Sequence, residues 1–279
     1  MNDVILKAEN IHYSYDSEKE ALKGVSLDIH KKERLVILGA NGSGKSTFFL
    51  NINGVLKPES GEVYYKDKLI DKSGIKELRK NVGIVFQDAD NQIIASSVRA
   101  EVSFGPMNLG LDKEEVKKRV DDALNYMNIH HLIDRPPHYL SGGEKKRVSI
   151  ADIIAMDSKI IIFDEPTASL DPKNVAIFED ALDKMSSDGK TLVISTHDIE
   201  FAYRFADRIV VFCDGNIIAD GKPVDVLSDS NVLKMANLKK PILLDVFDTL
   251  VENSIVKKDC VPVRSVEEFR DLIISQAKA

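Results

Sequence analysis

The chain has 279 residues, and its 38 basic and 45 acidic side chains give a net charge of -7. This balance argues against a general nucleic-acid-binding protein, although it leaves room for a local basic patch. Because no apolar stretch reaches the about 18 to 20 residues of a membrane helix, and the N-terminus lacks the apolar region of a signal peptide, we expect a cytoplasmic protein.

Residues 3 to 29 alternate apolar and polar side chains in the manner of two strands, separated by a polar segment at residues 16–20. These strands predict a small β layer beside an α/β core. Tyr13 and Tyr15 lie where the first strand ends. A tyrosine in that position is most often half-buried sheet surface, but an aromatic face close to a nucleotide can stack on its base.

A glycine-rich loop, GANGSGKST, follows the apolar run at residues 35–38 and leads into an apolar helix start. Its glycines allow backbone N–H groups to approach phosphate oxygens closely, and the following helix adds its positive N-terminal dipole. Lys45 supplies a full charge to the phosphates, and the Ser46 hydroxyl is the expected protein ligand of Mg²⁺. The alternative is a structural glycine-rich turn. The predicted phosphate-binding residues are Gly39, Asn41, Gly42, Ser43, Gly44, Lys45, Ser46 and Thr47.

Polar side chains follow three further predicted strands at their carboxyl ends. Gln87 follows the strand at residues 82–86, Asp164 and Glu165 end the strand at 160–163, and His197 follows the strand at 191–195. Open α/β sheets bind ligands at this edge, and paired carboxylates there suit Mg²⁺ binding and water activation. The structural alternatives are a solvated loop for Gln87, a strand cap for the carboxylates and a structural role for the histidine.

Two predicted helices begin with capping-box patterns, Asp112 with Glu115 and Ser141 with Glu144. In the second, two glycines expose backbone N–H groups in the first turn, which makes a second anion site at a helix N-terminus. A third helix begins after Asp171, which precedes a proline. Residues 209–221 predict a hairpin with its turn at Asp214 and Gly215.

The alternation of strands and helices fades after about residue 228. We therefore expect a main domain over residues 1–228 and a small C-terminal appendage over 229–279. The two cysteines, Cys213 and Cys260, are too few and too far apart in the sequence to indicate a metal site or a disulfide framework.

In this order, the segments GANGSGKS, Gln87, LSGGE, IIIFDEP, ASLD and STHD resemble the nucleotide-binding subunits of ATP-binding-cassette proteins over about residues 3–228. The resemblance implies an α/β P-loop NTPase core of ABC type, with an antiparallel β subdomain and a helical subdomain over about residues 88–156. It implies binding of ATP and Mg²⁺ and hydrolysis of ATP.

The resemblance also assigns roles residue by residue. It implies that Tyr15 stacks on adenine, that Gln87 senses the metal and the γ-phosphate, and that Asp164 is the Mg²⁺-associated aspartate. Glu165 then corresponds to the general base and His197 to the γ-phosphate switch. The residues implied to act across a dimer interface are Ser141, Gly142 and Gly143 of the signature motif, and Asp171.

Such subunits pack head to tail as dimers, so the resemblance implies a second ATPase subunit, identical or related. Within the family, the segments VGIVFQDADNQI and VRAEVSFGPMNLGL resemble the ATPases of energy-coupling-factor importers of cobalt, nickel or vitamins. These work at the cytoplasmic face of the membrane with an integral-membrane transport subunit and a substrate-capture membrane protein. Ala89 and Asp152 depart from that group, which usually has proline and glycine at these positions.

Two other readings stay open. The first is an ABC ATPase that drives a scaffold, as in iron-sulfur cluster assembly, without transport. The second is an ATP-driven translation or DNA-repair factor, which the net charge and the lack of a long coiled-coil insertion disfavour. The sequence names neither the transported solute nor the identity of the partner subunit.

Overall fold

The computed structural model describes residues 3–15, 19–168, 170–257 and 259–277. Residues 16–18 of the polar segment predicted at 16–20, and Ser169 of the ASLD motif, lie outside this part of the chain. The strands are β1 (Val4–Ser14), β2 (Glu20–His30), β3 (Arg34–Leu38), β4 (Ser60–Tyr65), β5 (Lys68–Leu69), β6 (Val82–Val85), β7 (Ile160–Asp164), β8 (Thr191–Thr196), β9 (Arg208–Cys213) and β10 (Asn216–Gly221).

Both halves of the chain contain α-helices, and short 3-10 turns lie among those of the first half. The α-helices of the first half are α1 (Lys45–Ile52), α2 (Ile75–Asn81), α3 (Val98–Asn108), α4 (Lys113–Tyr126) and α5 (Gly142–Ala155). Those of the second half are α6 (Pro172–Ser187), α7 (Ile199–Phe205), α8 (Pro223–Ser228), α9 (Ser230–Met235), α10 (Ile242–Glu252) and α11 (Val266–Ala277). Short 3-10 turns are η1 (Ala89–Asn91), η2 (His130–Leu132) and η3 (Pro137–Tyr139).

Two sheets organise the molecule. The larger has the strand order β10-β9-β3-β8-β7-β6, in which all neighbours are parallel except the edge strand β10. The smaller is antiparallel, with the order β2-β1-β4-β5. The α/β fold class with an antiparallel layer is therefore confirmed, and so are the predicted strands before the glycine-rich loop.

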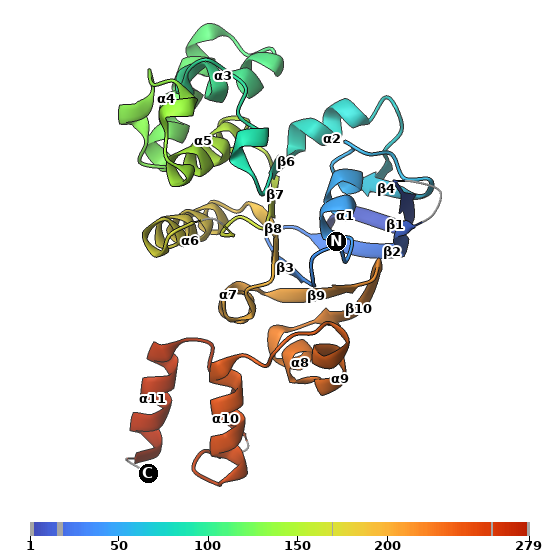
Figure 1. Cartoon of the computed structure of the whole chain (residues 1–279), viewed down its shortest axis with the longest axis vertical. Helices are drawn as coiled ribbons and strands as arrows, with labels where there is room; N and C mark the ends of the chain where they lie inside the picture. Colours follow the sequence, from blue (N-terminus) through green and yellow to red (C-terminus); the bar gives the residue numbers. More distant parts are fainter. Residues whose placement is uncertain (1–2, 16–18, 169, 258, 278–279) are drawn as a thin grey trace.

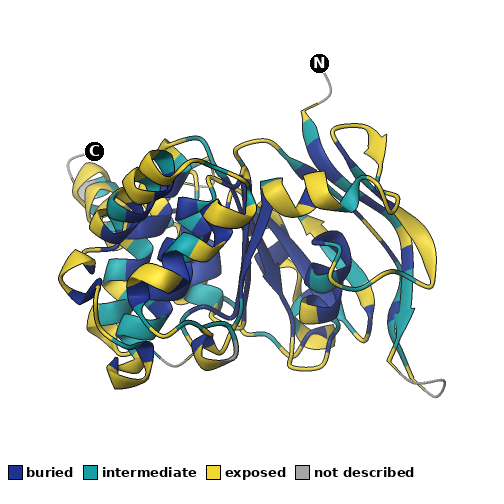
Figure 2. Ribbon diagram, turned by 90° about the horizontal axis from the view of Figure 1, so that it is seen from above, coloured by how far each residue is buried: buried dark blue, intermediate teal, exposed yellow. Residues whose placement is uncertain are grey.

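Apart from the edge strand β10, the large sheet is buried on both of its faces, as Figure 2 shows for its dark blue strands. On β3, Leu35 and Ile37 join a core with the small sheet and α1, whereas Val36 and Leu38 join a core with the helices on the other face. This burial explains why the inner strands of the sheet carry runs of consecutive apolar residues rather than alternating with polar ones. The rigid sheet fixes the loops at its carboxyl edge.

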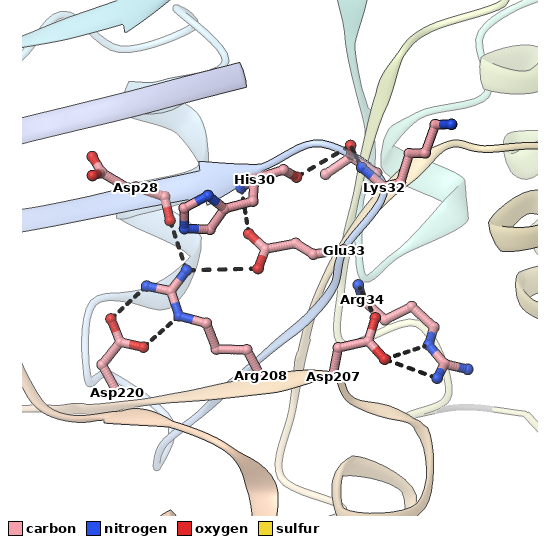
Figure 3. Close-up of polar contacts among 9 residues, drawn as sticks. Asp28, His30, Lys32, Glu33, Arg34, Asp207, Arg208 and Asp220 are labelled. Atoms are coloured by element: carbon pink, nitrogen blue, oxygen red, sulfur yellow. Dashed lines mark hydrogen bonds and ion pairs between the residues drawn. The ribbon is translucent and has the colours of Figure 1, made fainter. Parts of the chain in front are cut away.

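A polar cluster fastens the amino ends of the central strands to the small sheet (Figure 3). Arg208 at the start of β9 donates two hydrogen bonds of 2.5 Å to Asp220 of β10 and one of 2.9 Å to the Asp28 carbonyl of β2. Its guanidinium also lies 3.6 Å from Glu33, and burial raises the pKa of that carboxyl. The cluster lies at the edge of the sheet opposite to the glycine-rich loop, and it sets the relative position of the two sheets.

Helices α3, α4 and α5 form a group at one end of the molecule, and α10 and α11 lie at the other end (Figure 1). The prediction of a capping box at α4 was half right: Asp112 accepts from the backbone N–H groups of Glu114 and Glu115, but the Glu115 side chain pairs with Arg119 instead. The capping box of Ser141 and Glu144 is confirmed at α5, and the hairpin turn at Asp214 and Gly215 joins β9 and β10.

The C-terminal helices contact the rest of the chain through α7. Tyr203 of α7 donates a hydrogen bond of 3.0 Å to the Val263 carbonyl, and Arg264 donates to carbonyls at the end of α7. Leu244 of α10 is buried in the same hydrophobic core as Val36 and Leu38 of β3. We propose that residues 1–228 form one functional domain and that residues 229–279 are an appendage docked on it.

Candidate active site

The glycine-rich loop joins the buried strand β3 to helix α1 at the carboxyl edge of the sheet. Two of its glycines are required by their surroundings. A Cβ on Gly39 would lie 2.4 Å from the Phe212 carbonyl oxygen, and Gly44, with φ of 106°, would place one 2.7 Å from the Ala21 carbonyl oxygen. The loop is thus held against β9 and β2, with its backbone close to both, as phosphate binding at a helix N-terminus requires.

A cavity of about 580 Å³ opens directly over this loop. Its size is that of a small-molecule site. It brings together many of the residues predicted from the sequence, and also side chains and backbone of the β2 start and the β9–β10 turn. The lining residues are Tyr15, Lys19, Glu20, Ala21, Asn41, Gly42, Ser43, Gly44, Lys45, Ser46, Thr47, Gln87, Glu165, Asp214 and Gly215.

Lys45 is the buried cation of the site, with only 5% of its surface exposed. Its ammonium donates to the Gly39 carbonyl at 2.7 Å and to the Ala40 carbonyl at 3.1 Å, and it lies 3.6 Å from Glu165 Oε1. A buried charge needs such partners. The loop therefore holds a positive charge at the place where an anion would replace or join these contacts.

Glu165 stands at the centre of the catalytic candidates. It is buried, and its backbone has φ of 43°, a left-handed conformation that is uncommon for a non-glycine residue. Oε2 lies 2.9 Å from Nδ1 of the mostly exposed His197, whereas Oε1 has no hydrogen-bond partner. The buried carboxylate thus lies in the cavity wall between the Lys45 ammonium and the His197 ring.

Asp164 is the neighbouring carboxylate and is also buried. Its Oδ1 accepts a hydrogen bond of 2.6 Å from the Ser195 hydroxyl, and that same hydroxyl accepts from the Glu165 N–H at 2.9 Å. Ser195 was not predicted from the sequence. Its only signal in the sequence was its place at the end of a predicted buried strand. The sequence could not show that this strand, β8, lies beside β7, or in which register.

A metal ion would draw its protein ligands from different strand ends. Ser46 and Gln87 are exposed on the cavity wall, and Asp164 lies behind Glu165. In the described part of the chain, no three His, Cys, Asp or Glu side chains gather as metal ligands. The donors present, a hydroxyl, an amide oxygen and a carboxylate, fit Mg²⁺, which commonly takes one or two protein ligands together with phosphate oxygens and water.

Tyr15 lies at the rim of the same cavity, and 60% of its surface is exposed. Its hydroxyl is 3.2 Å from Thr47 Oγ1, and its ring meets Tyr13 edge to face, with centroids 5.2 Å apart. These contacts fix the ring beside the loop, where a planar base could lie against it.

The signature segment is placed differently, because none of Ser141, Gly142 and Gly143 lines the cavity. Ser141 caps α5, and Gly142 is exposed, so that a Cβ added to it would meet nothing within 4 Å. A Cβ on Gly143 would lie 2.4 Å from the Asn174 amide, which in turn donates to Asp171. The N–H of Asn174 holds the pKa of Asp171 below its usual range. The signature residues and Asp171 thus form a second cluster of their own.

Lys146 joins the two clusters and was missed in the sequence. It lies one turn into α5 and is buried, and its ammonium donates to the Phe86 carbonyl at 2.6 Å and to the Gln87 carbonyl at 3.1 Å. Burial lowers its pKa to about 8, although Asp164 and Asp88 oppose this. A lysine on the buried face of a helix was the available signal, and its target lay almost 60 residues away in the sequence.

Comparison with known proteins agrees with this site. The family model described as ABC transporter matches residues 22–168. The chain is 42% identical to an energy-coupling factor transporter ATP-binding protein of Methanocaldococcus jannaschii, over 98% of each chain. It is 44% identical to another such protein of Clostridium perfringens, over 90% of each chain.

Solved structures give the same result. CbiO1 from Clostridium perfringens, described as part of the transporter complex cbiONQ, superposes with a TM-score of 0.74 and 44% identity, covering 88% of this chain and all of that one. A dimeric ABC transporter cassette superposes with a TM-score of 0.71 and 34% identity, covering 78% of this chain and 99% of that one. A post-hydrolysis state of that cassette is bound to ADP and phosphate.

Fold, site and comparisons together define an ATPase, and the chain belongs to the ABC transporter family. Within that family, its relatives include the ATP-binding proteins of energy-coupling factor transporters. Within the described residues, no helix has both the length and the apolar composition needed to cross a membrane.

Proposed function

We propose that this chain is the ATP-hydrolysing subunit of an importer, and that it drives uptake of a transition-metal ion, cobalt or nickel, or of a vitamin through a separate membrane protein. The observation that carries the enzymatic part is the contact of Lys45 and His197 with the buried Glu165 in the wall of one cavity. The importer part rests on the energy-coupling factor relatives and on CbiO1.

In this proposal the adenine lies against Tyr15, and the phosphates lie on the loop from Gly39 to Thr47. Lys45 moves from the loop carbonyls to the phosphate oxygens and neutralises their charge. Glu165 accepts the proton of the attacking water, and His197, hydrogen-bonded to Glu165, orients that carboxylate and contacts the γ-phosphate. Mg²⁺, when bound through Ser46, Gln87 and Asp164, supplies further charge stabilisation.

The signature cluster completes the site of a second copy or of a related subunit. The exposed N-terminal turn of α5 offers backbone N–H groups and a positive dipole end, which suit the γ-phosphate of an ATP held elsewhere. ATP bound between two subunits would close the dimer, and hydrolysis would open it. The dimeric cassette to which this chain is similar supports such an arrangement.

Association with a membrane protein would place the chain at the cytoplasmic face of the membrane as a peripheral subunit. The direct test is to tag the chain in its native host, solubilise the membranes in detergent, and identify by mass spectrometry what is purified with it. A matched purification of the Lys45→Ala variant controls for partners that depend on ATP binding.

Recovery of a multi-span membrane protein together with a second, smaller membrane protein would support the importer, and the ligand bound to the smaller one would identify the solute. Recovery of soluble partners alone, with nothing from the membrane fraction, would overturn the proposal and favour an ATPase that acts on a scaffold complex.

A further inference from the structure

Ser195 occupies a central position that the proposed mechanism does not use. Strands β7 and β8 are parallel neighbours, and their register sets Asp164 directly beside Ser195. The serine is completely buried, with 0% of its surface exposed. Its hydroxyl has a full set of close partners, since it donates to Asp164 Oδ1 at 2.6 Å and accepts from the Glu165 N–H at 2.9 Å.

These two hydrogen bonds hold adjacent residues with different proposed tasks. The first fixes the rotation of the Asp164 carboxylate by engaging one of its two oxygens. The second fixes the peptide unit that leads into Glu165, where the backbone takes its left-handed turn with φ of 43°. A non-glycine residue keeps such a conformation only when its surroundings enforce it. One hydroxyl therefore holds both the carboxylate of Asp164 and the backbone of Glu165.

We propose that Ser195 is a positioning residue for ATP hydrolysis, which aligns the metal-binding Asp164 with the proton-accepting Glu165. The proposal rests on the roles proposed above for these two carboxylates. Ser195 is fully buried and does not line the cavity, so it acts through the two residues that it holds. Without its hydroxyl, Asp164 could rotate, and the buried N–H of Glu165 would have no partner.

The competing explanation is that Ser195 is an ordinary buried hydroxyl that only stabilises the fold. The same strand supplies a matched control, Thr191, which is 1% exposed. Its hydroxyl accepts from the Lys32 N–H at 2.8 Å and lies 3.4 Å from the His30 carbonyl. Thr191 lies at the amino end of β8, away from the cavity, so its loss tests stability without touching the carboxylates.

The experiment compares Ser195→Ala with Thr191→Val in the full-length protein. Four quantities are measured: the thermal unfolding midpoint, kcat for ATP hydrolysis, KM for ATP, and the affinity for Mn²⁺ in the presence of ADP by electron paramagnetic resonance. Outer hydrogen-bond partners of metal ligands typically contribute about 10- to 100-fold to metal affinity or activity. We expect Ser195→Ala to lower kcat about 10- to 100-fold and Mn²⁺ affinity about 10-fold, with KM changed less than about 3-fold.

Thr191→Val is expected to lower the unfolding midpoint about as much as Ser195→Ala does, but to keep the wild-type kcat and Mn²⁺ affinity. Wild-type kcat and Mn²⁺ affinity in Ser195→Ala would overturn the proposal, and so would equal losses in both variants. Glu165→Gln, assayed in parallel, separates this proposal from its premise. If Glu165→Gln hydrolyses ATP at the wild-type rate, the assigned roles themselves fail. If its hydrolysis is lost, the result for Ser195→Ala tests the positioning role separately from those roles.

Discussion

The two proposed anion-binding regions of this chain, the glycine-rich loop and the N-terminus of α5, differ in how they present positive charge. The first contains a cavity of about 580 Å³ with a buried lysine and a buried glutamate in its wall. The second carries no buried charge at its tip, and offers an exposed helix N-terminus held in place by Ser141 and Asn174. In the proposed function, the first region therefore binds the nucleotide with its own groups, whereas the second completes the site of another subunit.

The difference also suits the two regions to different proposed tasks: ATP hydrolysis for the first, and completion of the site when the dimer closes for the second. Lys45 and Glu165 are buried and lie 3.6 Å apart, and His197 contacts Glu165, which suits the first region to the proton transfer proposed for it. A helix N-terminus that binds a ligand on another subunit must instead stay accessible until the dimer closes. Lys146 of α5 connects the two regions, because its ammonium donates to the carbonyls of Phe86 and Gln87.

The largest effect is expected from Glu165→Gln, which removes the proton acceptor and leaves the shape of the phosphate-loop region intact. ATP hydrolysis should fall by about 10²- to 10⁴-fold, the range usual for loss of a general base. ATP binding, measured by equilibrium dialysis, should be retained, and size-exclusion chromatography with ATP should show more dimer. Hydrolysis at the wild-type rate would reject the role assigned to Glu165.

A substitution in the α5 N-terminal region, Gly143→Ala, should lower ATP hydrolysis without lowering ATP affinity. Its effect on hydrolysis should be smaller than that of Glu165→Gln. The added Cβ would lie 2.4 Å from the Asn174 amide and displace it from Asp171. We expect hydrolysis to fall about 10-fold, while the monomer keeps its ATP affinity, because the phosphate loop is untouched. Gly142→Ala serves as the comparison for the Asn174 contact, since its Cβ would meet nothing within 4 Å in this chain and leaves Asn174 on Asp171. A parallel loss of ATP affinity in Gly143→Ala would contradict the separation of the two regions.

Lys146→Met tests the connection between the regions. Methionine keeps much of the side-chain volume but donates no hydrogen bond to the Phe86 and Gln87 carbonyls. We expect hydrolysis to fall several-fold, with faster amide hydrogen exchange around residues 86–88. Lys145→Met, on the neighbouring residue that pairs with Asp90 instead, is the control. Unchanged exchange in Lys146→Met would show that the loop does not depend on this contact.

The smallest effect concerns Asp152, which departs from the glycine usual in the energy-coupling group. Burial, with the charge of Glu101 adding to it, raises its pKa to about 7, and a hydrogen bond with Gln92 partly opposes this. Because the folded pKa lies above the unfolded value of 3.8, the stabilisation from proton binding is present at low pH and is lost as pH rises to about 7.

Asn at this position carries no proton to lose. Asp152→Asn should therefore gain about 1–3 kcal/mol of unfolding free energy relative to the wild type between pH 5 and pH 8, as measured by denaturant titration. An equal difference between the two proteins at both pH values would show that Asp152 does not titrate in this range.

Much of the fold and of the first region could be predicted because their signals are local. The loop from Gly39 to Thr47 and the apolar strands are contiguous in sequence, and strand ends in an α/β sheet meet at one edge. Ser195 and Lys146 could not be assigned, since their partners are set by strand register and by helix packing over long separations. Helix α3 was not predicted from its own residues, although it lies within the helical subdomain over about residues 88–156 that the resemblance implies.

The central claim, that each ATP site is built from the phosphate loop of one subunit and the signature region of another, has a direct test. Lys45→Ala and Ser141→Arg variants, carrying different affinity tags, are produced together, and mixed dimers are purified through both tags. Each variant alone should be inactive, whereas a mixed dimer contains one intact site of two and should hydrolyse ATP at about half the wild-type rate per dimer. Mixed dimers as inactive as either parent would contradict the account.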